Sequence, residues 1–230
     1  MNVELVKTYR FEAAHELPYL GGAKRLHGHS YEVDVVVAGA CDETLEWLID
    51  YADITTRFDG LYRTLDHHTL NNIAALDDVR IEGVRQWILR RLAERLHTLK
   101  DVRVRIVGEC AFNPVLIDAD AGLDLPERVG FGFEAAHSLP RLPADHKCYR
   151  MHGHSFRVEA AGDLGTLERA LKEVYDTLDH QCLNEIAGLE NPTSESISRW
   201  IWRRLEAAGA RPEAVVVAET CTARCIYRGR

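Results

Sequence analysis

Six of the eleven histidines form two sets with nearly the same spacing. In each set a single histidine precedes a His-Gly-His segment: His15, His27 and His29, and His137, His152 and His154. Strand side chains two residues apart project from one face, so both histidines of a His-Gly-His pair point the same way, and the small glycine leaves the other face open. The first histidine, on the neighbouring strand of the hairpin, then meets them. Three imidazoles with a vacant fourth position predict a catalytic zinc site. The alternative, a merely polar strand face, is disfavoured because the spacing occurs twice.

Two Asp-His dipeptides add candidate acid/base groups. Asp66-His67 and Asp179-His180 each follow a leucine and precede a Leu-Asn pair. Adjacent side chains on a strand diverge, so we do not expect the members of each dipeptide to pair simply with one another. A carboxylate that orients an imidazole is common in acid/base catalysis, and a surface turn is the alternative interpretation.

A thiol and a carboxylate complete the candidate set. Cys148 lies four residues before His152, where zinc and Lys147 would favour the thiolate, as a base or nucleophile. Inert packing is the alternative, and Ala23 takes this place in the first set. Glu219 ends an apolar strand, where we expect it to meet a hydrogen-bond donor; an exposed strand-end acid is the alternative. Glu109 matches it loosely.

These residues belong to segments that occur twice in the same order. The repeated blocks are Phe11 to His15 with Phe133 to His137, His27 to Ser30 with His152 to Ser155, Leu65 to His67 with Leu178 to His180, and Trp87-Ile88 with Trp200-Ile201. The chain is therefore a tandem duplication. We expect a first copy at residues 1–118 and a second at 128–230, with the join between 113 and 128, where Pro114, Gly122 and Pro126 interrupt an acidic stretch.

Hydrophobic spacing indicates strand, strand, helix and strand in each copy. Alternation over 31–37 and 156–160 predicts half-buried antiparallel strands. Helical spacing covers 84–99 and 197–205, with Pro192-Thr193-Ser194 as a helix start, and strands follow at 102–106 and 214–217. The second copy is 12 residues shorter than the first after its His-Gly-His, a loss we assign to part of 41–58, where 48–51 indicates a short strand leading into a helix. Helices do not alternate with parallel strands, so the fold class is α+β with an antiparallel sheet.

Composition excludes several functions. The net charge of −8 disfavours a protein that binds duplex nucleic acid without regard to sequence. Six cysteines are too few for a disulfide scaffold. No apolar run is long enough to cross a membrane, and the first residues do not resemble a signal peptide, so we expect a cytoplasmic protein.

Four separated blocks of the second copy resemble the 6-pyruvoyltetrahydropterin synthase family, and within it the branch that forms the carboxy product. The blocks are residues 148–154, 178–180, 189–195 and 219–227, and the Cys-x3-His-Gly-His spacing is the branch feature. The resemblance covers nearly all of the second copy and, more loosely, the first.

The resemblance implies a tunnelling fold (T-fold), a four-stranded antiparallel sheet with two helices on one face, copies of which assemble into a barrel as a homo-oligomer. It implies Zn²⁺ on the histidine triads and conversion of 7,8-dihydroneopterin triphosphate to 6-carboxy-5,6,7,8-tetrahydropterin, with loss of acetaldehyde and triphosphate, in the queuosine and deazapurine pathway. The implied roles are proton transfer by Cys148 with an Asp-His pair, pterin binding by Glu219 with Thr220 nearby and Glu109 in the first copy, and triphosphate binding by Lys147 and Arg150.

The departures from the family leave three questions open. Ala23 replaces the cysteine, and no threonine follows Glu109, so the first copy is either catalytic or structural. Family sites lie between neighbouring units, so either Asp66-His67 or Asp179-His180 serves Cys148. The alternatives to the carboxy-forming reaction are pyruvoyl formation, an aldolase-like cleavage, and a non-catalytic pterin-binding protein.

Overall fold

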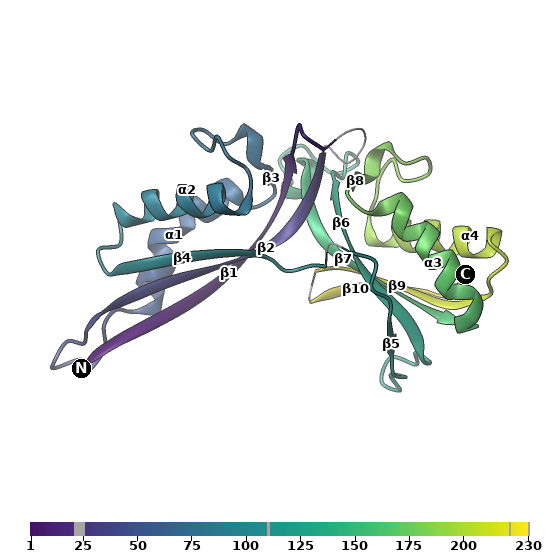
Figure 1. Cartoon of the computed structure of the whole chain (residues 1–230), viewed down its shortest axis with the longest axis horizontal. Coiled ribbons are helices and arrows are strands. Elements are labelled where there is room, and N and C mark those ends of the chain that lie inside the picture. Colours follow the sequence, from purple (N-terminus) through teal and green to yellow (C-terminus); the bar gives the residue numbers. More distant parts are fainter. Residues whose placement is uncertain (21–25, 110, 221, 230) are drawn as a thin grey trace.

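The computed structural model describes residues 1–230 except 21–25, 110, 221 and 230. Ala23, and with it the comparison between Ala23 and Cys148, lies outside the described residues. The chain folds as two similar halves joined side by side in an arch, with the helices on its outer side and the sheets beneath them (Figure 1).

The first copy is built on one long hairpin. Its elements are β1 (Asn2–Glu16), β2 (Leu26–Ala40), α1 (Tyr51–Leu65), β3 (His68–Thr69), α2 (Ile81–Ala93) and β4 (Leu99–Ile106). The sheet order is β3-β1-β2-β4, in which β1, β2 and β4 are antiparallel and β3 adds a two-residue parallel pairing to β1.

The second copy repeats this plan. Its elements are β6 (Arg128–His137), β7 (His152–Gly162), α3 (Leu164–Leu178), β8 (Gln181–Cys182), α4 (Ser194–Ala207), β9 (Pro212–Thr220) and β10 (Ala223–Tyr227). The sheet order is β10-β9-β7-β6-β5, with β8 parallel to β6. The predicted α+β class with antiparallel sheets is confirmed.

The connecting strand β5 (Val115–Ile117) belongs to the sheet of the second copy. The sequence assigns these residues to the end of the first copy, but β5 pairs antiparallel with the start of β6. Residues that follow the first sheet therefore extend the second one.

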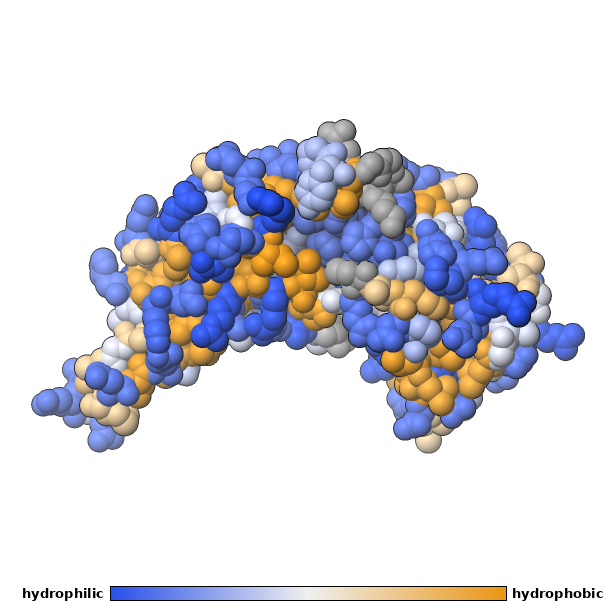
Figure 2. All heavy atoms as spheres, in the orientation of Figure 1, coloured by the Kyte–Doolittle hydropathy of each residue, from blue (hydrophilic) through white to orange (hydrophobic). Residues whose placement is uncertain are grey.

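Each copy has its own core between sheet and helices. In the first, Phe11 stacks on Tyr31 with ring centroids 4.8 Å apart, and in the second Phe133 stacks on Phe156 at 4.9 Å. Figure 2 shows hydrophilic side chains over the helical outer face and hydrophobic patches along the sheets beneath. None of the described helices is long and apolar enough to cross a membrane.

The elements differ from the sequence prediction in four respects, although one predicted helix is confirmed. The helix that starts at Ser194 is confirmed, and the Thr193 side chain accepts from the Ser196 N–H at its N-terminus. The helix predicted to reach Leu99 ends at Ala93, because Leu99 already belongs to β4.

Spacing alone missed α3, although the resemblance implied two helices per copy. Residues 48–49 form no strand, and Asp50 caps α1. The second copy keeps the helix and lacks most of the loop before it.

The two copies meet where their central strands cross at the His-Gly-His segments. A Cβ atom added at Gly153 would overlap the Cα of Gly28, and one added at Gly28 would overlap the Cα of Gly153. The sequence interpretation, that glycine leaves the opposite face open, is incomplete, because that face is occupied by the other copy. Glycine is required here since only two backbones without side chains can approach this closely.

Candidate active site between the two copies

The second-copy triad is a buried cluster at the ends of β6 and β7. His137 and His152 are fully buried, and His154 is 2% exposed. The register pairs His137 with His152, which places the first histidine on the hairpin neighbour, as the spacing predicts. Ligand atoms of these three histidines and of Glu219 lie within 4.8 Å of one another.

Each of these imidazoles has an acceptor at Nδ1. The Nδ1 atoms lie 3.0 Å from the Pro192 carbonyl, 2.7 Å from the Arg150 carbonyl and 2.9 Å from Glu12 Oε2, for His137, His152 and His154 respectively. Carbonyl and carboxylate oxygens only accept, so each neutral ring carries its proton on Nδ1 and turns the Nε2 lone pair inward.

The inward Nε2 atoms fit a metal ion. Among the described side chains, none of the three buried Nε2 atoms has a hydrogen-bond partner, although those of His137 and His154 lie 3.4 and 3.2 Å from Glu219 Oε1. Three convergent imidazole lone pairs beside a carboxylate are a donor set for a divalent transition metal such as zinc. The residues therefore fit the implied ion.

Burial and neighbouring charges shift the pKa values of the groups in this cluster. Burial lowers the pKa of His152 far below its ordinary value and also lowers that of His137. Burial also opposes charge on His154, but the carboxylates of Glu12 and Glu219 outweigh it and raise the pKa of His154 to about 9, so a metal ion here would bind in place of the Nε2 proton. Burial disfavours charge on Glu219 too, yet its contacts with His137 and His154 hold its pKa well below the ordinary range. Ser194 Oγ donates to Glu219 Oε2 at 2.9 Å, the hydrogen-bond donor expected for this carboxylate.

The Asp-His pair beside this cluster comes from the first copy. Ligand atoms of His67, Cys148 and His152 lie within 4.8 Å, and the His67 and His152 ring centroids are 4.4 Å apart. Arg150 Nε donates to the His67 carbonyl oxygen at 3.0 Å, so the second copy also holds the backbone of His67. Between the two pairs that the sequence leaves open, Asp66-His67 is the one that lies beside Cys148.

The Asp-His side chains do pair with one another, contrary to the expectation that they diverge. His180 Nδ1 and Asp179 Oδ2 form a hydrogen bond of 2.7 Å, whereas His67 Nδ1 lies 2.9 Å from Asp66 Oδ1 as an ion-pair contact without hydrogen-bond geometry. The aspartates end α1 and α3, and both histidines have positive φ angles, 56° at His67 and 55° at His180. The alternation of strand side chains does not apply to a helix end followed by a left-handed residue.

Cys148 lies in a single 3-10 turn of residues 147–149, in which His146 Nδ1 accepts from the Cys148 N–H at 3.1 Å. Burial raises the pKa of the thiol, and Lys147 only partly offsets this. The protein groups alone therefore favour the thiol, and the thiolate expected from the sequence needs a bound cation.

The first copy contains a matching cluster. Ligand atoms of His15, His27 and His29 lie within 4.8 Å, and all three side chains are buried. His180 of the second copy lies against it, 4.6 Å from the His27 ring centroid. Burial, with the positive charge of neighbouring histidines, lowers the pKa of His15 to about 4 and that of His29 to about 3.

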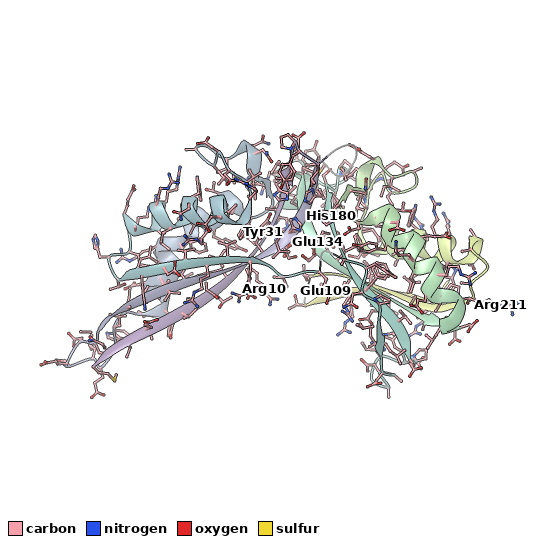
Figure 3. The ribbon with its side chains drawn as sticks, in the orientation of Figure 1. Arg10, Tyr31, Glu109, Glu134, His180 and Arg211 are labelled. Atoms are coloured by element: carbon pink, nitrogen blue, oxygen red, sulfur yellow. The ribbon has the colours of Figure 1, made fainter. Side chains whose placement is uncertain are left out.

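The register changes the expected match of Glu109 with Glu219. In the first copy Tyr31 pairs with Ile106. In the second copy Arg157 pairs with Ala218, so the antiparallel register sets Phe156, the equivalent of Tyr31, opposite Glu219. Ile106 is therefore the counterpart of Glu219. Glu109 is exposed and contacts Asn113 (3.4 Å). In Figure 3 it lies apart from Glu134 and His180, which meet at the junction of the copies. Ile106 instead lines a cavity of about 530 Å³ together with the three histidines and His180.

Thr220 is separated from Glu219. Neighbouring strand residues point to opposite faces, and Thr220 lines a different cavity, of about 280 Å³, between the copies with Ser30 and Ser155. Glu12 and Glu134, which contact the triads from the opposite copy, were not among the residues picked out from the sequence. Their one signal was their position inside the repeated Phe-Glu-Ala-Ala-His block.

The sequence model of the 6-pyruvoyl tetrahydropterin synthase family matches residues 4–111 and again 128–230. The chain belongs to this family. It is a tandem member, because the family model matches each copy separately.

Three curated relatives of this pterin synthase family are similar to the chain. A 6-carboxy-5,6,7,8-tetrahydropterin synthase from Synechocystis is 42% identical over 115 residues, 42% of this chain and 88% of the relative. A protein named putative 6-carboxy-5,6,7,8-tetrahydropterin synthase from Archaeoglobus fulgidus is 36% identical over 40% of this chain and 84% of its own. A dihydroneopterin monophosphate aldolase from Pyrococcus furiosus is 29% identical over 42% of this chain and 80% of its own.

Proposed function

We propose that this chain is a zinc-dependent 6-carboxy-5,6,7,8-tetrahydropterin synthase of the queuosine and deazapurine pathway, acting in the cytoplasm. It converts one 7,8-dihydroneopterin triphosphate and one water to the carboxytetrahydropterin and releases acetaldehyde and triphosphate. The observation that carries the proposal is that Cys148 and His67 meet the second-copy triad at His152, which belongs to both groups of ligand atoms. The Synechocystis relative, 42% identical, supports the carboxy product.

The residues divide the work as follows. His137, His152 and His154 hold zinc, which, when bound, polarises oxygen atoms of the substrate side chain as a Lewis acid. Cys148 Sγ moves protons at the side-chain carbons, and His67 exchanges protons with it. The Asp66 carboxylate, 2.9 Å from His67 Nδ1, holds the imidazole in orientation.

Glu219 binds the two-donor edge of the pterin, a bidentate match for a carboxylate. Glu219 Oε1 lies 3.2 Å from His154 Nε2, so the carboxylate must turn from the triad to bind the pterin with both oxygens. Lys147 binds the triphosphate. Arg150 was expected to do the same, but its Nε is committed to the His67 carbonyl, so its first task is to hold His67.

We propose one active site per chain. The first copy retains three histidines and receives His180, but Ile106 stands where the pterin-binding carboxylate would be. Its triad binds metal, and its contribution to catalysis is Asp66-His67.

Aldolase-like cleavage is the alternative with support, since the Pyrococcus furiosus relative is an aldolase. Incubation of the zinc-loaded protein with 7,8-dihydroneopterin triphosphate separates the candidates by the mass and ultraviolet spectrum of the product. The account predicts 6-carboxytetrahydropterin and acetaldehyde. A 6-hydroxymethyl or pyruvoyl product would assign the other chemistries, and binding without turnover would assign a pterin-binding protein.

We also propose that chains assemble into a homo-oligomer through their sheets. Among the described residues, β4 has a partner strand on one edge only, and β1 has a partner on its second edge only at Ala13 and Ala14. Unpaired N–H and C=O groups along a strand edge are a template for another chain. Sedimentation equilibrium tests this, and a monomer at micromolar concentration would contradict it.

A further inference from the structure

The two triads share a feature that the proposed reaction does not use: each receives a glutamate from the opposite copy. His154 Nδ1, in the second copy, lies 2.9 Å from Glu12 Oε2 of the first. His29 Nδ1, in the first copy, lies 2.7 Å from Glu134 Oε2 of the second. Glu12 and Glu134 are equivalent positions of the repeated block, so the exchange is reciprocal.

Both glutamates are fixed where they cross the junction. Ser30 Oγ donates to Glu12 Oε2 at 2.6 Å, and Ser155 Oγ donates to Glu134 Oε2 at 2.8 Å. The same two hydroxyl oxygens accept from backbone N–H groups of the other copy, Ser155 N–H to Ser30 Oγ at 3.0 Å and Ser30 N–H to Ser155 Oγ at 3.1 Å. The carboxylates therefore sit in a hydrogen-bonded frame that exists only when both copies are folded against each other.

The backbone of each glutamate also holds the Asp-His pair of its own copy. The Glu12 N–H donates to Asp66 Oδ1 (3.1 Å) and its carbonyl accepts from the His67 N–H (2.6 Å). The Glu134 N–H donates to Asp179 Oδ1 (3.0 Å), and its carbonyl accepts from the His180 N–H (2.5 Å). Each glutamate thus holds an Asp-His pair through its backbone and a triad histidine of the opposite copy through its side chain.

A carboxylate that accepts from Nδ1–H fixes the tautomer and orientation of a metal-ligating imidazole and raises the basicity of Nε2. We propose that Glu12 and Glu134 are positioning residues for metal binding in the opposite copy, so that the zinc affinity of each copy is set by a glutamate of the other. This rests on the metal binding included in the proposed function and not on the reaction.

Competition with a chromophoric chelator measures the zinc affinity of each site separately. A His27→Ala chain reports the second-copy site alone, and a His152→Ala chain reports the first-copy site alone. Glu12→Ala and Glu134→Ala are placed in each background, with Glu12→Gln and Glu134→Gln as isosteric variants that keep an acceptor but lose the charge.

Glu12→Ala should weaken zinc binding about 10–100-fold in the His27→Ala chain, with Glu12→Gln intermediate, and change it less than about threefold in the His152→Ala chain. Glu134→Ala and Glu134→Gln should show the reverse pattern. Loss of affinity in the residue's own copy, equal loss in both copies or no loss in either would overturn the inference. If neither parent chain binds zinc, the metal part of the proposed function fails as well, whereas failure of the pterin reaction alone leaves the inference standing.

Discussion

At the scale of single residues, the account depends on Cys148 as the group that transfers protons. Removing such a group typically costs about 10²–10⁴ in rate, so Cys148→Ala should lose at least about 10² in kcat. Zinc content and the melting temperature should stay unchanged, because the metal is held by the histidines. Cys225→Ala, which removes a thiol next to Ser198, serves as the control. Appreciable turnover by Cys148→Ala would mean that the first copy catalyses.

The two Asp-His pairs provide a matched comparison. His67 lies 4.4 Å from the His152 ring centroid and close to Cys148, whereas His180 lies 4.6 Å from that of His27 in the copy with Ile106. His67→Gln should lower kcat about 10²–10⁴-fold, and His180→Gln should change it less than about tenfold. Steady-state turnover of both zinc-loaded variants measures this. The reverse order would assign catalysis to the first-copy site.

Residue types and spacing predicted the two triads, the thiol and the Asp-His pairs. They could not predict which pair serves which site, because that depends on how two folded copies dock. The match of Glu109 to Glu219 followed the letters, whereas the antiparallel register that selects Ile106 appears only when β2 and β4 are aligned. The pairing within Asp179-His180 was missed because a helix end and a positive φ are not visible as a strand pattern.

At the scale of elements, the crossing of β2 and β7 depends on two glycines. Gly153→Ala places a Cβ against the backbone of Gly28, which no side-chain movement can relieve. We expect a loss of about 1–3 kcal/mol in the free energy of unfolding, together with weaker zinc binding as His152 and His154 are displaced. Urea denaturation measures the first quantity.

Gly60→Ala is the control for this substitution, since Gly60 lies inside α1 and its added Cβ meets only Arg95 Nη1 at 3.6 Å. It should stabilise the protein by about 0.5–1 kcal/mol. Equal effects of the two variants would contradict the close crossing.

The ion pairs of the first sheet predict a pH dependence. Although burial opposes charge on Asp34, Arg105 (Nη1 to Oδ2, 2.6 Å) and the Thr8 hydroxyl lower its pKa below the ordinary value. A lowered folded-state pKa adds stability that is present above the unfolded pKa of about 4 and is lost as pH falls through the folded value.

Asp34→Asn should therefore lower the free energy of unfolding by about 0.2–1 kcal/mol at pH 6, since Arg105 is half-exposed. The difference from the wild type should shrink between pH 4 and pH 2. Denaturation at a series of pH values measures both, and Glu43→Gln in an exposed loop makes the same charge change as a control. A difference that stays constant with pH would exclude the ion pair as its cause.

Element prediction was most accurate where one periodicity ran through the middle of an element, as in the strands at 31–37 and 156–160, although residues 31–37 are buried on both faces of β2 and not half-buried. It failed at α3, although Leu167, Leu171, Val174 and Leu178 have helical spacing and are buried. The deletion in the second copy was assigned to a region that included the helix, whereas the chain lost the preceding loop and kept the helix. The helix prediction for 84–99 ran on too far because Leu99, a strand residue, falls in phase with the helical positions.

At the scale of the whole molecule, duplication has joined two units whose histidine clusters each contact residues of the other copy. His67 and Glu12 contact the triad of the second copy, and His180 and Glu134 contact that of the first. Under the proposed function, the first copy therefore remains necessary even with Ile106 at its pterin position. Its junction residues Glu12 and His67 contact the second-copy triad.

The central claim is that one chain builds its own active site from both copies, and complementation tests it most directly. Cys148→Ala and His67→Gln chains are purified, mixed under conditions that allow oligomers to exchange, and assayed for turnover of 7,8-dihydroneopterin triphosphate. If Cys148 and His67 act within one chain, every site in the mixture carries a defect and activity stays at the level of the separate variants. Recovery toward about a quarter of the wild-type rate, the value for random pairing between chains, would contradict the account.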